Sequence, residues 1–269
     1  CAASHWGKSF GDVLELDSRA ADRRLSYGPE EDQFAELWLP AGHPGKPPLV
    51  VLIHGGCWLE AYDVSHIRPL AAALSDRGYA VLAPEYRRVG QEGGGWPGTF
   101  EDIATLVDGL DRLSLDPADL SKTAIVGHSA GGQLALWAAG RKNIKTMQQL
   151  YSAAPFNPRG VIGLAAITDL AAYAEGESSC QKAVPQLMGG TPDERPGRYR
   201  QASPAELGIP VPTILLQGDA DTIVPVEQAK ALPSARLQLI EGAGHFDLVH
   251  PGTPAFGLLV RELETMLSP

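Results

Sequence analysis

Short apolar runs alternate along the chain with longer stretches in which apolar residues recur every three or four positions. The run at 49–53 is apolar throughout, which is typical of a strand covered on both faces. Strands are predicted at 24–28, 33–40, 49–53, 79–84, 123–127, 161–167, 213–217 and 237–240. Helices are predicted at about 67–77, 100–113, 130–140 and 254–267. This order predicts an α/β fold with a mostly parallel central sheet and helices on both faces.

The chain shows no internal repeat, low-complexity tract or linker, so we expect a single domain over residues 1–269. Residues 169–210 differ from the rest because they lack strong periodicity and carry Gly189-Gly190 and several prolines. We expect this segment to form a cap-like excursion over the edge of the sheet.

The composition fits a globular protein with a deep core. In 269 residues, Lys and Arg total 22 and Asp and Glu total 32, which gives a net charge of −10. Folding a chain of this size buries about three quarters of its surface. The acidic balance counts against nucleic acid as a partner, because phosphate binding needs clustered Lys and Arg. No apolar stretch approaches the roughly 18 residues that a transmembrane helix needs.

Three cysteines are too few for a disulfide framework, although one bridge with one residue left over is possible. Cys1-Ala2-Ala3-Ser4 is similar to the start of a mature bacterial lipoprotein. Two interpretations stay open: an exported protein held at a membrane through a lipid on Cys1, or a cytoplasmic protein whose Cys1 only marks where the chain was cut. No cofactor or metal is expected, since phosphate-loop and metal-ligand spacings are missing.

The clearest chemical signal is Gly127-His128-Ser129-Ala130-Gly131, which matches G-x-S-x-G between a predicted strand and a predicted helix. A sharp turn at this place lifts the Ser129 hydroxyl above the sheet, and small residues on either side let the chains pass closely. The N–H of Ala130, at the start of the helix, points at any developing oxyanion. Ser129 is therefore the candidate nucleophile.

A nucleophilic serine needs a base, and only two histidines follow Ser129 in the sequence. His245 lies in a glycine-rich loop directly after the last predicted strand, where a side chain can reach back over the sheet. We predict His245 as the base, and we expect His250 to be exposed or to cap a turn.

The acid is expected after the strand at 213–217, and Asp221 is the preferred candidate. Its predicted role is to accept a hydrogen bond from the Nδ1–H of His245 and to stabilise the imidazolium that forms. Asp219 is expected to fold its own turn by bonding local backbone, and Asp247 is too near His245 in sequence to approach it comfortably.

The stretch His54-Gly55-Gly56-Cys57-Trp58 follows the strand at 49–53 and resembles the oxyanion loop of lipases and esterases. That resemblance implies that Gly56 and Cys57 supply N–H groups beside that of Ala130. Cys57 would act through its backbone, with its thiol packed as a small hydrophobe. Trp58 either lines the acyl pocket or packs in the core, and Trp96 and His128 are further candidates for the substrate pocket.

In chain order, the oxyanion loop, Ser129, Asp221 and His245 resemble an α/β-hydrolase of the carboxylesterase type, over about 24–267. The oxyanion loop, the segment after the strand at 79–84 and Trp96-Pro97 are most similar to the small esterases grouped with kynurenine formamidase and feruloyl-esterase-like proteins. This resemblance implies an α/β-hydrolase fold.

One position departs from that group, whose strand-end segment often reads D-Y-R. The chain has Glu85 there, and we expect this change to be structural. Tyr86 and Arg87 are expected to brace the edge of the sheet by hydrogen bonds. The alternative is that Arg87 and Arg88 face an anionic substrate.

The resemblance implies a serine hydrolase that cleaves small carboxylic esters through an acyl-enzyme. Short acyl groups are favoured because no long apolar segment suggests a lipase lid. The alternatives are an arylformamidase that acts on an N-formylkynurenine-type amide, a prolyl-oligopeptidase-like peptidase and a non-catalytic binding module. In each enzymatic interpretation the partner is a small ester or amide.

Overall fold

The computed structural model describes residues 5–269, so the hypothesis of a lipid on Cys1 concerns a residue outside the described ones. Eight strands form one sheet in the order β1-β2-β4-β3-β5-β6-β7-β8. Strands β3 to β8 pair in parallel, and β2 joins β1 to β4 by antiparallel pairing. The predicted α/β fold is therefore confirmed. The strands are β1 (Arg23–Ser26), β2 (Phe34–Trp38), β3 (Pro48–Ile53), β4 (Ala80–Pro84), β5 (Asp119–His128), β6 (Gly160–Leu164), β7 (Thr213–Gly218) and β8 (Arg236–Ile240).

Two apolar cores lie on the two faces of the sheet. Successive side chains of β3 enter them in turn: Val51 packs into one and Val50 into the other. The first core contains residues of α3 (Gly98–Asp108) and α4 (Ala130–Gly140). The second contains residues of α1 (Phe10–Leu14), α2 (Arg68–Asp76) and α10 (Pro254–Met266). Burial on both faces explains why β3 is a continuous apolar run.

The remaining helices are short. Residues 169–210 contain α5 (Leu170–Tyr173), α6 (Ser179–Met188), α7 (Pro196–Ala202) and α8 (Pro204–Leu207), and α9 (Val226–Lys230) follows β7. Single 3-10 turns form at Val64–Ile67, Leu110–Arg112, Arg141–Asn143 and Phe246–Leu248. The helix predicted at 100–113 is shorter than expected, because α3 ends at Asp108 before Gly109 and the chain tightens into a 3-10 turn.

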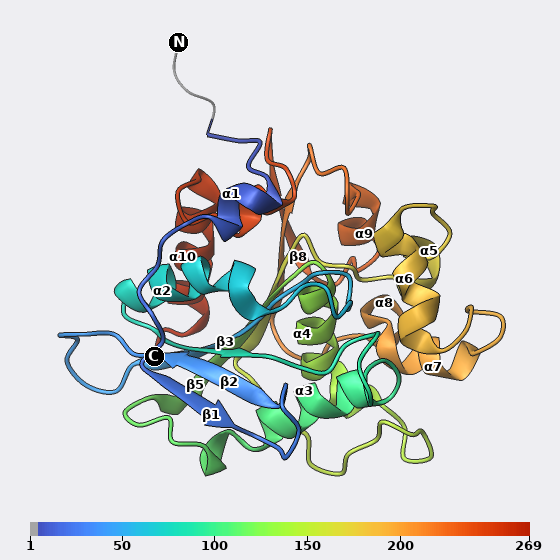
Figure 1. Ribbon diagram of the computed structural model, residues 1–269, viewed down its shortest axis with the longest axis horizontal. Coiled ribbons are helices and arrows are strands. Elements are labelled where there is room, and N and C mark those ends of the chain that lie inside the picture. The colour runs from blue at the N-terminus through green and yellow to red at the C-terminus, as the bar shows by residue number, and fades with distance from the viewer. Residues whose placement is uncertain (1–4) are drawn as a thin grey trace.

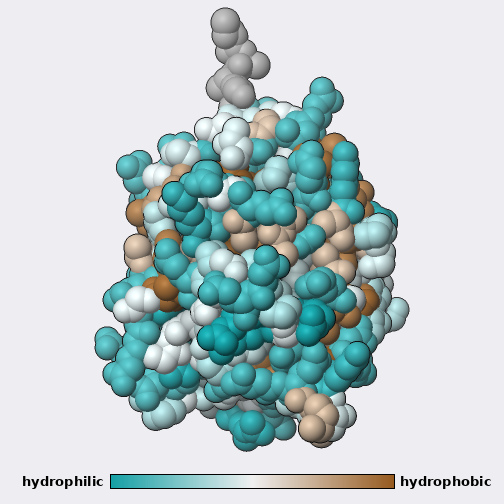
Figure 2. Space-filling view, turned by 90° about the vertical axis from the view of Figure 1, so that its right-hand side faces the viewer, coloured by the Kyte–Doolittle hydropathy of each residue, from teal (hydrophilic) through white to brown (hydrophobic). Residues whose placement is uncertain are grey.

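Helices α5 to α7 gather on one side of the molecule, drawn in yellow and orange in Figure 1. Figure 2 views the molecule from that side and shows a largely hydrophilic face with small, separate apolar patches. Among residues 5–269, no helix has both the length and the apolar character needed to cross a bilayer.

Candidate active site

Ser129 lies at the sharp turn between β5 and α4. Its backbone has φ 58° and ψ −117°, a strained conformation that L residues rarely adopt. Two glycines make the turn possible: a Cβ on Gly127 would lie 2.0 Å from the Gly131 carbonyl oxygen, and one on Gly131 would lie 2.2 Å from that of Ile53. The Ser129 N–H donates to the Leu164 carbonyl on β6 at 2.9 Å. The local geometry is that of a strained strand-to-helix turn, as the sequence predicts.

Asp221 and His245, predicted to pair, are hydrogen-bonded. His245 Nδ1 lies 2.8 Å from Asp221 Oδ2, and both side chains are almost completely buried. The other carboxylate oxygen of Asp221 accepts from the N–H groups of Ile223 and Val224, each at 2.8 Å. Because these two donors fix the carboxylate, its free oxygen accepts the Nδ1–H of His245. In a neutral imidazole, a proton on Nδ1 leaves Nε2 as the hydrogen-bond acceptor, which is the arrangement that a general base requires.

His128 links Ser129 to the His245 loop. Its ring lies 4.5 Å from the His245 ring, centre to centre, and its Nε2 donates to the His245 carbonyl at 3.0 Å. The Ser129 hydroxyl itself forms no hydrogen bond among the described residues, and the hydrogen bond between this turn and the His245 loop is made by His128. Apo active sites often leave that contact loose.

That His128 lines the substrate pocket stays a prediction. Its side chain is buried, and its Nδ1 has no hydrogen-bond partner among the described residues. Burial, with the nearby His245, holds the pKa of His128 well below its ordinary value. The ring is therefore neutral and braces the His245 loop from below.

Three other candidates around His245 have structural contacts. Asp219, expected to fold its own turn, instead accepts from the N–H of Gly242 at 2.8 Å, across to the His245 loop. Asp247 is buried and accepts from backbone N–H groups, not from His245. His250 accepts from the N–H of Gly252 through Nδ1 at 2.9 Å, so it caps a turn as expected.

The predicted oxyanion loop passes directly against Ser129. A Cβ on Gly55 would lie 2.7 Å from the His128 carbonyl oxygen and 3.2 Å from the Ser129 Cβ, so a larger residue would clash with the backbone of this turn. The next three residues all have positive φ: 108° at Gly56, 56° at Cys57 and 57° at Trp58. Trp58 is fully buried, and its Nε1 donates to Gln133 Oε1 at 2.9 Å. Of the two interpretations of Trp58, packing in the core is therefore correct.

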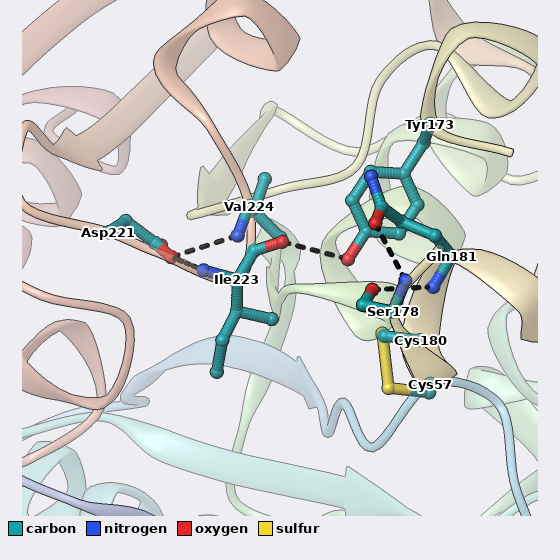
Figure 3. The surroundings of a disulfide bond; sticks show 8 residues. All are labelled: Cys57, Tyr173, Ser178, Cys180, Gln181, Asp221, Ile223 and Val224. Atoms are coloured by element: carbon teal, nitrogen blue, oxygen red, sulfur yellow. Dashed lines mark hydrogen bonds between the residues drawn. A yellow bond between two sulfur atoms is a disulfide. The ribbon is translucent and has the colours of Figure 1, made fainter. Parts of the chain in front are cut away.

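Cys57 forms a disulfide with Cys180 on α6, across 123 residues of sequence (Figure 3). The prediction that the Cys57 thiol packs as a small hydrophobe was therefore wrong. The single disulfide that three cysteines allow joins Cys57 to Cys180. Nothing in the local sequence of either cysteine indicates the pairing, because the contact depends on how α6 packs beside the oxyanion loop.

Glu85 lies beneath the predicted oxyanion loop and is 2% exposed. One carboxylate oxygen lies 2.6 Å from His54 Nε2 and 3.5 Å from Arg88 Nε, and the other accepts from the Val64 N–H at 2.8 Å. Burial by itself would raise the pKa of Glu85, but His54, Arg88 and the Val64 N–H together hold it below its ordinary value. Glu85 therefore has the structural role that we expected, as a buried carboxylate that holds the first residue of the oxyanion loop.

The two arginines after Glu85 are both paired within the protein. Arg87 donates to the buried Asp102, with Nη2 2.8 Å from Oδ1. Arg88 is 4% exposed and contacts Asp32 at 3.1 Å. Neither guanidinium is free to bind an anion, so the alternative of an anionic substrate at these residues was wrong.

Trp96 is half-buried, and its side chain contacts Gln149, Phe100 and Arg198. Its Nε1 donates to Gln149 at 3.1 Å, its ring is 5.4 Å from that of Phe100, and Arg198 lies 5.5 Å from it. None of these three partners is hydrogen-bonded to Asp221 or His245, and that Trp96 lines the substrate pocket stays a prediction. Within residues 5–269, no group of three or more His, Cys, Asp or Glu side chains could hold a metal ion.

Comparison with known proteins agrees with this geometry. The BD-FAE family model matches residues 35–235. Esterase LipC of Mycobacterium tuberculosis is 27% identical over 249 residues, which cover 84% of this chain and 60% of LipC. A kynurenine formamidase of Drosophila melanogaster is 29% identical over 128 residues, 46% of this chain and 40% of that protein. The chain spans about three fifths of the length of the first curated relatives that it matches.

Solved structures share the fold. Esterase B from Lactobacillus rhamnosis superposes with a TM-score of 0.79 at 20% identity, covering 94% of this chain and 88% of its own. A truncated carbohydrate esterase from gut microbiota gives a TM-score of 0.73 at 21% identity, covering 91% of this chain and 95% of its own. Both carry the arrangement of sheet and helices described above.

Proposed function

The chain belongs to the BD-FAE family, of α/β-hydrolase fold, and from this premise we propose that it hydrolyses small carboxylic esters with Ser129 as nucleophile, His245 as base and Asp221 as acid. The observation that carries the proposal is the buried hydrogen bond between His245 Nδ1 and Asp221 Oδ2, at 2.8 Å. It fixes the tautomer in which Nε2 is free to take a proton. The strained turn at Ser129 and the neutral His128 beside it support the same assignment.

In the proposed mechanism, His245 takes the Ser129 proton as the hydroxyl attacks the ester carbonyl. Asp221 stabilises the imidazolium that results. The N–H groups of Gly56, Cys57 and Ala130 stabilise the oxyanion, and losing one such donor typically costs roughly 3 kcal/mol of transition-state stabilisation. His245 then protonates the leaving alcohol, and water hydrolyses the acyl-enzyme by the same steps.

A formamidase activity is the second candidate, because a kynurenine formamidase is among the relatives. The same groups would cleave a formyl amide by the same steps. A panel of p-nitrophenyl esters of increasing acyl length, run beside N-formylkynurenine and scored by kcat/KM, separates the two. A higher kcat/KM for the short esters supports the esterase, and a higher value for the formamide supports the alternative.

The proposal is tested by Ser129→Ala with p-nitrophenyl acetate as substrate. We expect kcat/KM to fall by roughly 10⁴-fold or more, because the nucleophile is lost while the fold remains. Ser234→Ala is the matched control, since Ser234 is an exposed serine before β8 that contacts none of these residues. Retained hydrolysis by Ser129→Ala would remove Ser129 from the role given to it here.

A further inference from the structure

The disulfide joins the predicted oxyanion loop to a helix of the segment 169–210 (Figure 3). We propose that Cys180 is a positioning residue for ester hydrolysis. Its disulfide bond to Cys57 holds the oxyanion loop in the backbone conformation that catalysis needs, so full turnover requires the disulfide to be intact. This inference rests on the function proposed above, and it adds a residue that no motif of the chain indicates.

The loop needs an outside support because its backbone is strained. Gly56, Cys57 and Trp58 have positive φ in succession, and for the last two this conformation costs energy that the surroundings must supply. On one side the support is visible: the Trp58 side chain is locked in the core by Gln133, and the Trp58 carbonyl accepts from the Val89 N–H at 2.9 Å. Cys57 has its support on the other side, through the sulfur of Cys180.

Helix α6 is a firm point of attachment. Ser178 caps its first turn in both directions, with Gln181 as the reciprocal partner, and Cys180 lies within that turn with 4% of its surface exposed. At the far end, the Leu187 carbonyl accepts from the N–H of Trp96 at 2.8 Å. Because both ends of α6 are held by hydrogen bonds, Cys180 has a fixed position. Its disulfide therefore restrains the backbone of Cys57.

The same segment also supports the acid. Tyr173, on α5, donates from its hydroxyl to the Ile223 carbonyl at 2.9 Å, and the Ile223 N–H donates to Asp221 Oδ1 at 2.8 Å. Figure 3 shows this chain of contacts together with the disulfide. Asp221 is therefore held by hydrogen bonds that do not depend on the disulfide. Breaking the bridge should therefore loosen the oxyanion donors and leave the pair Asp221–His245 in place.

Reduction provides a reversible way to break the bridge. A thiolate of dithiothreitol attacks one sulfur of the disulfide and forms a mixed disulfide, and the second thiol of the reagent then closes its own ring. Two electrons and two protons pass to the protein, which leaves Cys57 and Cys180 as thiols and the reagent oxidised.

The experiment compares kcat and KM for p-nitrophenyl acetate in oxidised protein, reduced protein and Cys180→Ser, with Ser179→Ala as the matched control on the same helix. We expect reduction and Cys180→Ser to lower kcat by about tenfold or more while KM changes little, because oxyanion donors act mainly in the transition state. Dithiothreitol should not affect Cys180→Ser further, and re-oxidation should restore only the wild type. Ser179→Ala should retain full activity.

A purely structural bridge would give a different result. Cys180→Ser would then melt at a lower temperature but keep the wild-type kcat at 25 °C, and that outcome overturns the inference while the esterase function stands. If Cys180→Ser does not fold, the reduced wild type, checked by circular dichroism, gives the same comparison. An oxidised wild-type protein without esterase activity would overturn the proposed function and this inference together.

Discussion

Asp247 joins the N-terminal segment to the loop that carries His245 by hydrogen bonds. Replacing Asp247 measures how much these bonds contribute to the stability of the protein. Its Oδ2 accepts from the N–H groups of Gly7 and Gly244 at 2.9 and 2.7 Å, and its Oδ1 accepts from that of Lys8 at 2.9 Å. The Asp247 side chain is fully buried, whereas the three backbone donors are only partly buried. The substitution Asp247→Asn keeps the shape and removes one acceptor oxygen.

The expected loss of stability follows from the number of backbone N–H groups that Asp247 accepts. An asparagine can accept with its single oxygen, but its NH2 group then faces at least one N–H, which is left without a partner. The lost charge-assisted bond and the partly buried donor that then faces the NH2 group cost about 3 kcal/mol together. For 269 residues, 1 kcal/mol shifts Tm by roughly 2 °C, so we expect Tm to fall by about 6 °C.

The assay is differential scanning calorimetry at pH 7, with Asp219→Asn as the control in the neighbouring turn. Asp219 accepts one hydrogen bond, from the N–H of Gly242, and is exposed, so its loss should shift Tm by about 2 °C or less. Equal shifts for the two variants would refute the reasoning, because burial and the number of donors would then make no difference.

Two further predictions concern the buried groups beneath the oxyanion loop. Glu85→Gln should destabilise the protein by about 3 kcal/mol in urea unfolding, because it removes the buried charge that faces the His54 ring and leaves Arg88 with Asp32 as its one carboxylate partner; a loss below 1 kcal/mol would contradict this. Burial lowers the pKa of His66 to about 3, so between pH 6.5 and 3 the unfolded chain binds one more proton at this residue, and the free energy of unfolding falls by about 1.4 kcal/mol per pH unit of acidification. His66→Phe should remove that part of the slope between pH 6 and pH 5, and parallel stability profiles for the two proteins would count against it.

The features that the sequence predicted well are those set by local constraints. A parallel strand covered on both faces must be apolar throughout, and β3 and β4 show this directly in the run of buried residues. The turn at Ser129 and the close approach at Gly127 need particular small residues at fixed spacing, so the motif is visible without the fold. The order of strand, turn and helix around them followed from the same pattern.

The features that the sequence could not supply depend on distant partners. Cys57 and Cys180 are 123 positions apart, and only the packing of α6 brings them together. A motif also does not say which way a side chain points: the sequence left Trp58 either at the acyl pocket or in the core, and it packs in the core. The helices of 169–210 are too short for periodicity to reveal, and α6 even contains Pro185.

The central claim is that Ser129 is a nucleophile activated by its surroundings, and covalent labelling tests it most directly. We predict that a fluorophosphonate adds one label per chain to the oxidised protein, that peptide mapping by mass spectrometry finds the label on Ser129, and that Ser129→Ala takes up none. A wild-type protein that stays unlabelled, or a label on another residue, would contradict the claim.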